Sequence, residues 1–108
     1  MMKTLRETCI ETGVSRRGLQ WYEHAGLIHP SGHNERGHLL YDADTIRRIK
    51  YIRLLQDFGF SIKMITTIID APVPELKKVL EEQLPKLEEK NSQMQEVIQK
   101  LRELIESL

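Results

Sequence analysis

The segment from Thr12 to Leu27, TGVSRRGLQWYEHAGL, constrains the fold of this chain more than any other stretch. Gly13 is typical of the left-handed residue that ends one helix, and Ser15 is typical of the N-cap of the next. Val14 and Leu19 stand on either side of this cap at the spacing of a hydrophobic staple. Two short helices joined by a glycine-containing turn form a helix-turn-helix, which is the architecture that this segment predicts.

The second helix of this motif has two unlike faces. At about 100° per residue, Gly18, Leu19 and Tyr22 fall on one side. The opposite side is basic, aromatic and hydrogen-bonding, and it consists of Arg16, Arg17, Gln20, Trp21 and His24. That composition is typical of a helix that enters a DNA groove. An ordinary surface helix with solvated charges remains the alternative, because short helix-turn-helix patterns recur by chance.

Charge is distributed unevenly along the chain, although the formal net charge is zero. Residues 1–64 carry ten Lys and Arg against seven Asp and Glu, which gives +3. Residues 65–108 carry six against nine, which gives −3. A basic first part and an acidic second part predict that only the first part meets a polyanion.

Cysteine and histidine give little indication of metal chemistry. Cys9 is the only cysteine, so an intrachain disulfide and a cysteine-cluster metal site are both excluded. We interpret Cys9 as a small core residue rather than a redox sensor, because no resolving thiol accompanies it. The four histidines are His24, His29, His33 and His38, spaced five, four and five residues apart. No carboxylate–histidine pattern lies on one helical face. We therefore expect no metal and no cofactor.

The N-terminal residues and the apolar runs bear on location. Lys3, Arg6 and Glu7 interrupt any early apolar run, so no signal peptide is predicted. No stretch approaches the eighteen apolar residues of a membrane span. We expect a cytoplasmic, nucleoid-associated protein without a membrane partner.

Loop chemistry follows the helix-turn-helix. The stretch from His29 to Gly37 is rich in Gly, Pro, Ser and Asn. His38–Tyr41 contains good strand formers, and with Leu27–His29 it is expected to close a small hairpin, or wing. Asn34 and Arg36 at its tip are candidate phosphate contacts, and a bare surface loop is the alternative.

Two more helices are predicted after the wing. Asp42 is the expected cap of a third helix, whose isoleucines at positions 46, 49 and 52 indicate the centre of the core. Gly59 ends this helix, and Ser61 caps a fourth that runs to about Asp70. Lys63 in its first turn is a candidate phosphate contact.

The C-terminal part carries an unbroken heptad pattern, with steps of four and three residues. Its members are Leu80, Leu84, Leu87, Asn91, Met94, Ile98, Leu101, Ile105 and Leu108. A helix of this kind cannot bury its apolar seam alone, so it requires a partner; a helix folded back on its own N-terminal part is the alternative. Pro85 predicts either a kink or a new helix that starts there. The heptads do not decide between parallel and antiparallel pairing.

Taken together, these residues resemble the MerR family of bacterial transcription regulators. The resemblance covers most of Leu5–Asp70 and rests on Gly13-Val14-Ser15, Arg17, Leu19, Tyr22-Glu23, Gly26-Leu27, Pro30, Gly37, Tyr41 and Phe58-Gly59-Phe60-Ser61. It implies a winged helix-turn-helix that dimerises through a long C-terminal helix, as an antiparallel pair. It also implies binding to a pseudo-palindromic promoter site, with the DNA bent and untwisted to control RNA polymerase. In the family, the positions of Arg17 and Tyr22 belong to the DNA-facing segment, whereas helical phase places Tyr22 towards the core.

Four positions depart from the family pattern. Gln20 stands where a basic residue is usual, and Trp21 where a tyrosine is usual. His38 and Leu39 replace a Tyr-Arg pair in the wing. Because Leu39 cannot bind phosphate, either the wing binds DNA less tightly or Arg36 supplies that contact. Trp21 and Gln20 are expected to alter the DNA sequence preference, since glutamine is able to bond adenine bidentately.

The sequence therefore predicts an all-α fold with a small β-hairpin wing, in which residues 1–71 form a DNA-binding domain and residues 72–108 a linker and dimerisation coiled coil. The expected DNA contacts are Ser15, Arg16, Arg17, Gln20, Trp21, Tyr22, His24, Asn34, Arg36, His38 and Lys63. The expected dimer contacts are Leu84, Leu87, Asn91, Met94, Ile98, Leu101, Ile105 and Leu108.

The expected partners are double-stranded DNA, a second copy of the chain and RNA polymerase. The sequence shows no set of residues arranged for catalysis, so we do not expect an enzyme. The alternatives are an architectural or recombination accessory protein that bends DNA, and a coiled-coil adaptor whose N-terminal part binds protein. We find no effector-binding domain or cysteine-bearing metal loop after the helix in this sequence, which fits a regulator that answers only to its own concentration, a natural short form or a fragment of a longer protein.

Overall fold

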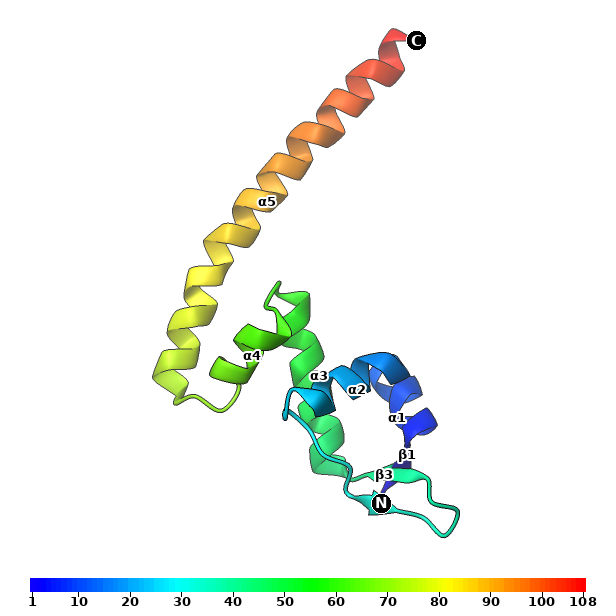
Figure 1. The fold of residues 1–108 in the computed structure, drawn as a ribbon. Coiled ribbons are helices and arrows are strands. Elements are labelled where there is room, and N and C mark those ends of the chain that lie inside the picture. The colour runs from blue at the N-terminus through cyan, green and yellow to red at the C-terminus, as the bar shows by residue number, and fades with distance from the viewer. The chain divides into compact units, whose positions relative to one another are not determined.

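The computed structural model describes all residues from Met1 to Leu108. The chain is mostly helical and has one small sheet (Figure 1). The elements in chain order are β1 (Lys3–Thr4), α1 (Leu5–Thr12), α2 (Arg16–His24), β2 (Gly32–His33), β3 (Leu39–Tyr41), α3 (Ala43–Asp57), α4 (Ile62–Ile68) and α5 (Val73–Ser107). The chain divides into two compact units, Met1–Asp70 and Ala71–Leu108, which we call the head and the tail. The predicted fold class is confirmed.

Side-chain caps begin all four helices of the head, three of them at the predicted residues Ser15, Asp42 and Ser61. A serine, threonine or aspartate side chain accepts a backbone N–H three residues later: Thr4 from Glu7 (3.2 Å), Ser15 from Gly18 (2.9 Å), Asp42 from Thr45 (2.8 Å) and Ser61 from Met64 (3.1 Å). Glu7 completes a capping box, because its carboxylate accepts the Thr4 N–H at 2.9 Å. This hydrogen bond lowers the pKa of Glu7, and the Thr45 N–H lowers that of Asp42. Each cap satisfies a helix N–H that would otherwise have no partner.

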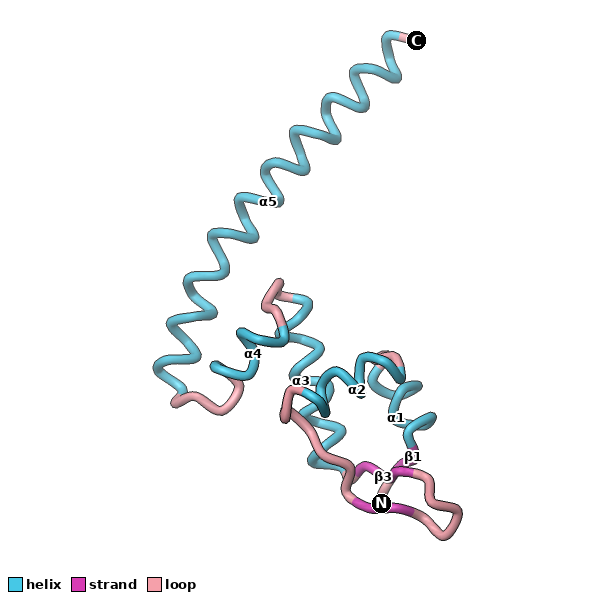
Figure 2. Tube along the Cα trace, in the orientation of Figure 1, coloured by secondary structure: helices cyan, strands magenta, loops and turns pink.

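The sheet has three antiparallel strands in the order β1-β3-β2 (Figure 2). In β1, Lys3 pairs with Tyr41, and in β2, His33 pairs with Leu39. A wing hairpin is therefore present, but its first strand is Gly32–His33 and not the predicted Leu27–His29. Leu27 and Ile28 are buried in the core instead. The Leu27 N–H donates to the Tyr22 carbonyl at 2.9 Å, just after α2 ends.

The core of the head is centred on α3, as predicted. Its inward residues Ile49, Ile52 and Leu55 have no exposed surface, and α1 and α4 pack against this helix. In α1 the fully buried small residue is Thr8, whose hydroxyl donates to the Thr4 carbonyl at 2.8 Å. Cys9 is only half-buried, so the innermost small position of α1 lies one residue earlier than we expected.

The tail is a single helix. α5 begins after Pro72 and continues through Pro85 to Ser107, so the alternative of a new helix starting at Pro85 is wrong. The head's last helix, α4, ends at Ile68, two residues earlier than predicted. No helix in the structure has the length and apolar character needed to cross a membrane.

No residue of α5 is buried in the single chain. The predicted seam is therefore largely uncovered. Its residues Leu80, Leu87 and Ile98 are half-buried, and Leu84, Asn91, Met94, Leu101, Ile105 and Leu108 are exposed. Val97 and Leu104 are also exposed and broaden the apolar stripe.

Candidate nucleic-acid interface

The turn before α2 is fixed by its backbone and by α3. Gly13 has φ 72°, the left-handed conformation that favours glycine, and its N–H bonds the Cys9 carbonyl at 2.9 Å. The Arg53 guanidinium on α3 donates to the Gly13 carbonyl. Ser15 then caps α2, so both the start and the direction of this helix are set by hydrogen bonds.

The two faces of α2 are confirmed. Leu19 and Tyr22 are 1% and 2% exposed, respectively, whereas Trp21 is 55% exposed. The remaining predicted contacts of this segment, Ser15, Arg16, Arg17, Gln20 and His24, are all exposed. The side chains expected to meet DNA on α2 are thus on one accessible surface, with Tyr22 as the exception.

Tyr22 does not belong to this accessible surface, which corrects its inclusion among the DNA contacts. Its ring is buried, and its hydroxyl donates to Oε1 of Gln56 on α3. Burial raises the pKa of the Tyr22 hydroxyl. The helical phase of the sequence predicted this burial correctly.

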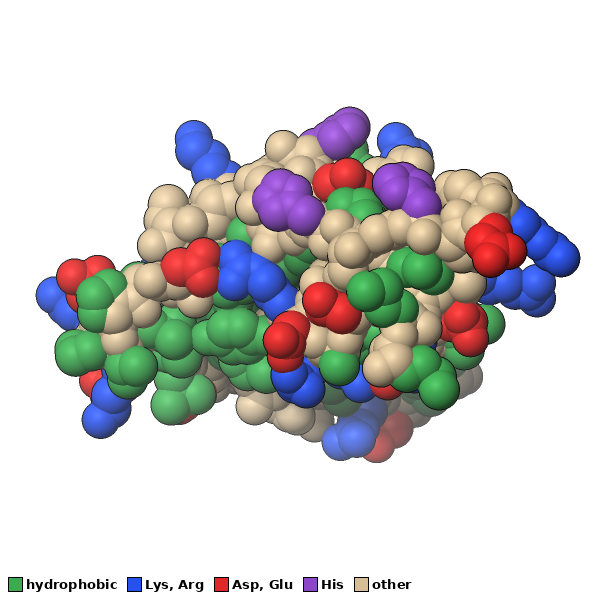
Figure 3. All heavy atoms as spheres, turned by 90° about the horizontal axis from the view of Figure 1, so that it is seen from below, with side chains coloured by type: hydrophobic (Ala, Val, Ile, Leu, Met, Phe, Trp, Pro, Cys, Tyr) green, Lys and Arg blue, Asp and Glu red, His purple; other side chains and the backbone are tan.

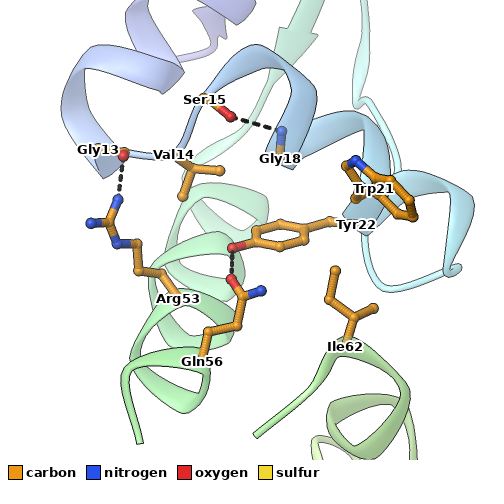
Figure 4. A pocket seen from close by; sticks show the side chains of 9 residues that line it. All are labelled: Gly13, Val14, Ser15, Gly18, Trp21, Tyr22, Arg53, Gln56 and Ile62. Carbon is orange, nitrogen blue, oxygen red and sulfur yellow. Dashed lines mark hydrogen bonds between the residues drawn. The ribbon is translucent and has the colours of Figure 1, made fainter. Parts of the chain in front are cut away.

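A hollow of about 470 Å³ lies beside α2 and opens to solvent; we call it the α2–α3 hollow. Its lining residues are Gly13, Val14, Ser15, Gly18, Trp21, Tyr22, Arg53, Gln56 and Ile62. Figure 4 shows Tyr22 pointing from α2 to Gln56, with Trp21 and Ile62 at the other end of the hollow. The contributions of Arg53, Gln56 and Ile62 were missed by sequence reasoning, because they come from other helices.

In the wing, Asn34 shapes the loop rather than projecting freely. Its Oδ1 accepts the backbone N–H groups of Arg36 and His38, both at 2.9 Å. An asparagine that bonds its own backbone two residues on is a common turn device. Arg36 and His38 are exposed, so these side chains and the Asn34 amide N–H₂ remain the groups that the wing offers. Leu39 lies in β3 and is half-buried.

The cations of the head fall into two groups. Five have a partner within the head: Lys3 and Lys50 with Glu11, Arg47 with Asp44, Arg48 with Asp70, and Arg53 with the Gly13 carbonyl. Lys3 and Lys50 lower the pKa of Glu11 by hydrogen bonding to it. No side-chain ion pair or hydrogen bond is present for the other five, which are Arg6, Arg16, Arg17, Arg36 and Lys63.

Four of these five unpaired cations are candidates that the sequence indicated, and Arg6 is the one that it missed. Lys63 is exposed in the first turn of α4, as expected. The place of Arg6 depends on β1, a strand of two residues that is too short to give a sequence signal.

The histidines do not form a metal site. On the face seen in Figure 3, histidine side chains are separated from one another by other side chains. No group of three or more His, Cys, Asp or Glu residues converges anywhere in the structure.

Comparison with known families identifies the class. A model described as MerR HTH family regulatory protein matches residues 3–72, and one described as MerR, DNA binding matches residues 46–104. The chain belongs to the MerR family of DNA-binding transcription regulators, which confirms the resemblance and the prediction that it is not an enzyme.

Individual relatives extend this result. Nodulation protein NolA of Bradyrhizobium sp. (strain NC92) is 42% identical over 59 residues, covering 55% of this chain and 25% of NolA. The HTH-type transcriptional activator mta of Bacillus subtilis is 32% identical over 88 residues, covering 82% of this chain and 34% of mta. The chain thus spans about a quarter to a third of these relatives.

Solved structures share the fold. MtaN, the N-terminal part of the Bacillus subtilis multidrug transporter activator, superposes with a TM-score of 0.72 at 27% identity, over 95% of this chain and 97% of its own. HiNmlR, a MerR family regulator lacking the sensor domain and bound to promoter DNA, gives a TM-score of 0.71 at 21% identity, over 91% and 79%.

Proposed function

We propose that this chain is a sequence-specific transcription regulator that binds a pseudo-palindromic promoter site as a homodimer and distorts the DNA. The observation that supports this function best is the division of the head's cations. Five of them are engaged by partners within the head, whereas the unpaired ones lie on or beside the helix-turn-helix, the wing and the start of α4. An unpaired guanidinium or ammonium group is free to neutralise phosphate.

In this proposal residues 1–71 are the DNA-binding domain, and α2 enters the major groove. Its contacts to bases and phosphates come from Ser15, Arg16, Arg17, Gln20, Trp21 and His24. The wing contributes Asn34, Arg36 and His38, and α4 contributes Lys63. Tyr22 supports α2 from the core and makes no direct contact.

Residues 72–108 are proposed as the linker and dimerisation helix. The 35 residues of α5 give about 52 Å of helix at 1.5 Å per residue. One side of this helix presents the largely exposed seam from Leu84 to Leu108. Burying this stripe against a second copy removes apolar surface from water, and Asn91 within it favours one register. Pro85, which costs about 3 kcal/mol in a helix interior, is tolerated because this packing offsets it.

A two-fold dimer presents its two α2 helices to inverted half-sites, which is why a pseudo-palindromic site is proposed. The promoter context is supported by HiNmlR, which was crystallised on promoter DNA, and by mta, a transcriptional activator. RNA polymerase at the promoter is the further partner that regulation requires.

The test uses the full chain and a duplex selected from a random-sequence pool. Binding is measured by fluorescence anisotropy at several salt concentrations, and log K is expected to fall with log salt with a slope of about −0.9 per phosphate neutralised. Arg17→Ala is expected to weaken binding and leave the dimer intact. Arg47→Ala, which removes an equal charge that is paired with Asp44, is the control.

A flat salt response of the wild-type chain would contradict DNA binding. A loss of folding in Arg17→Ala would show that its face was assigned wrongly. Transcription in vitro from the bound promoter separates regulation from DNA bending alone, because only a regulator changes the yield of transcript.

A further inference from the structure

A second hollow of about 470 Å³ lies in the head where three elements meet, and we call it the notch. It is lined by Thr4, Leu5 and Arg6 at the start of α1, by Arg16 at the start of α2, and by His38 and Leu39 at the start of β3. These segments belong to one compact unit but are far apart in the sequence. The notch therefore connects the helix-turn-helix to the wing.

Strand pairing explains why Arg6 reaches this place. Thr4 in β1 lies opposite Leu40 in β3. Thr4 is also the N-cap of α1, so the first turn of this helix rises directly beside the residues that precede Leu40. Arg6 in that turn and His38 before β3 are thus brought to the same hollow, although they are 32 positions apart.

The notch is basic and has no opposing carboxylate. Its three ionisable lining residues are Arg6, Arg16 and His38, and all three are exposed. No ion pair or hydrogen bond engages their side chains. Glu7, next to Arg6 in the chain, is held by the Thr4 N–H and lies outside the lining. Two unpaired guanidinium groups around one hollow create a local positive potential.

We propose that the notch holds one phosphate of the DNA backbone and that Arg6 on α1 is a DNA-binding residue outside the recognition helix α2. The inference rests on the proposed function and adds a site to it. A guanidinium presents N–H donors in a fork that matches two phosphate oxygens, and the imidazole adds one donor. The phosphate is assigned to DNA because both α2 and the wing, which flank the notch, are proposed to contact the duplex.

The test compares the wild-type chain with Arg6→Gln on the selected duplex. Removing one phosphate contact from each copy of the dimer is expected to make the log K against log salt slope less steep by about 1.8, which is 0.9 for each contact. Arg47→Gln, with the same change of charge at a residue already paired with Asp44, is expected to keep the wild-type slope. Arg6→Lys retains a point charge and is expected to keep most of the wild-type slope.

Phosphate-ethylation interference locates the contact. With the wild-type chain, ethylation of one additional phosphate in each half-site is expected to block binding, and with Arg6→Gln this phosphate becomes silent. Arg6→Met is a second variant that retains the apolar stem of the side chain, and it is expected to give the same two results if Arg6→Gln folds poorly.

An unchanged slope together with an unchanged interference pattern in the Arg6 variants would overturn this inference and leave the proposed function standing. Absence of DNA binding by the wild-type chain would overturn both. If inorganic phosphate raises the melting temperature of the wild-type chain and not of Arg6→Gln, while the DNA slopes are equal, the notch binds a free anion and the assignment to DNA is wrong.

Discussion

Arg48 on α3 joins two distant parts of the head, and its removal gives a sharp test of how the head is stabilised. Its Nη1 and Nη2 donate to the two carboxylate oxygens of Asp70 at 2.9 and 3.0 Å. Its Nε donates to the carbonyl of Leu27 at 2.5 Å. Arg48→Met removes all three hydrogen bonds and leaves the Leu27 carbonyl without this donor, whereas Asp70→Asn removes only the ion pair.

The structure indicates which loss is larger. The Asp70 side chain is 73% exposed, so the ion pair is worth at most about 1 kcal/mol. Leu27 is 4% exposed, and a buried carbonyl that loses its donor costs about 1–3 kcal/mol. We expect Arg48→Met to lower the free energy of unfolding by about 2 kcal/mol and Asp70→Asn by about 0.5 kcal/mol. At roughly 4–8 °C per kcal/mol, Arg48→Met is expected to lower Tm by roughly 8–16 °C.

Acid provides a second readout of the same pair. The hydrogen bonds from Arg48 lower the pKa of Asp70. A carboxyl group whose pKa is lowered by folding contributes stability above its unfolded-state pKa, and this contribution is lost as the pH falls through the folded-state pKa. The wild-type chain is therefore expected to lose, on acidification, a small increment of stability that both variants lack at every pH.

The assay is thermal unfolding followed by circular dichroism at 222 nm, at pH 7 and at a series of lower pH values. The protomer concentration is held fixed, because self-association shifts apparent stability. If Asp70→Asn costs as much as Arg48→Met at pH 7, the buried carbonyl is not the main term and the reasoning is refuted.

Three further changes test other parts of the molecule. Tyr22→Phe removes the hydrogen bond to Gln56, which is exposed and able to bond water, so unfolding is expected to become easier by about 1 kcal/mol; a large loss of DNA affinity with little change in Tm would mean that Tyr22 contacts DNA after all. Ser61→Ala removes the cap of α4 and is expected to cost about 1 kcal/mol by the same assay, and an unchanged Tm would count against the cap. Leu101→Glu places a charge in the seam of α5 and is expected to give monomers in sedimentation, with Glu103→Gln as the control outside the seam; a stable Leu101→Glu dimer would exclude this surface.

The parts of the fold that could be predicted from sequence are those fixed by near neighbours. The caps at Ser15 and Ser61 depend on a hydroxyl and an N–H three residues apart. The two faces of α2 follow from helical periodicity, which placed Tyr22 in the core even where a family resemblance favoured the surface.

The parts that could not be predicted depend on contacts between distant residues. β1 consists of two residues and exists because Lys3 and Thr4 pair with β3. The first wing strand lies later than expected, since Leu27 fills the core instead of an edge of the sheet. Arg6 became a candidate only when the position of α1 beside β3 was known, because nothing in its local sequence distinguishes it from other surface arginines.

The central claim is that two copies of the head present their unpaired cations to inverted half-sites. A hydroxyl-radical footprint of the full chain on a duplex selected from a random pool tests it most directly, with the mass of the complex measured in the same sample. We predict two protected blocks of inverted sequence and two chains per duplex. One protected block with one bound chain, or a selected pool without any inverted repeat, would contradict the account.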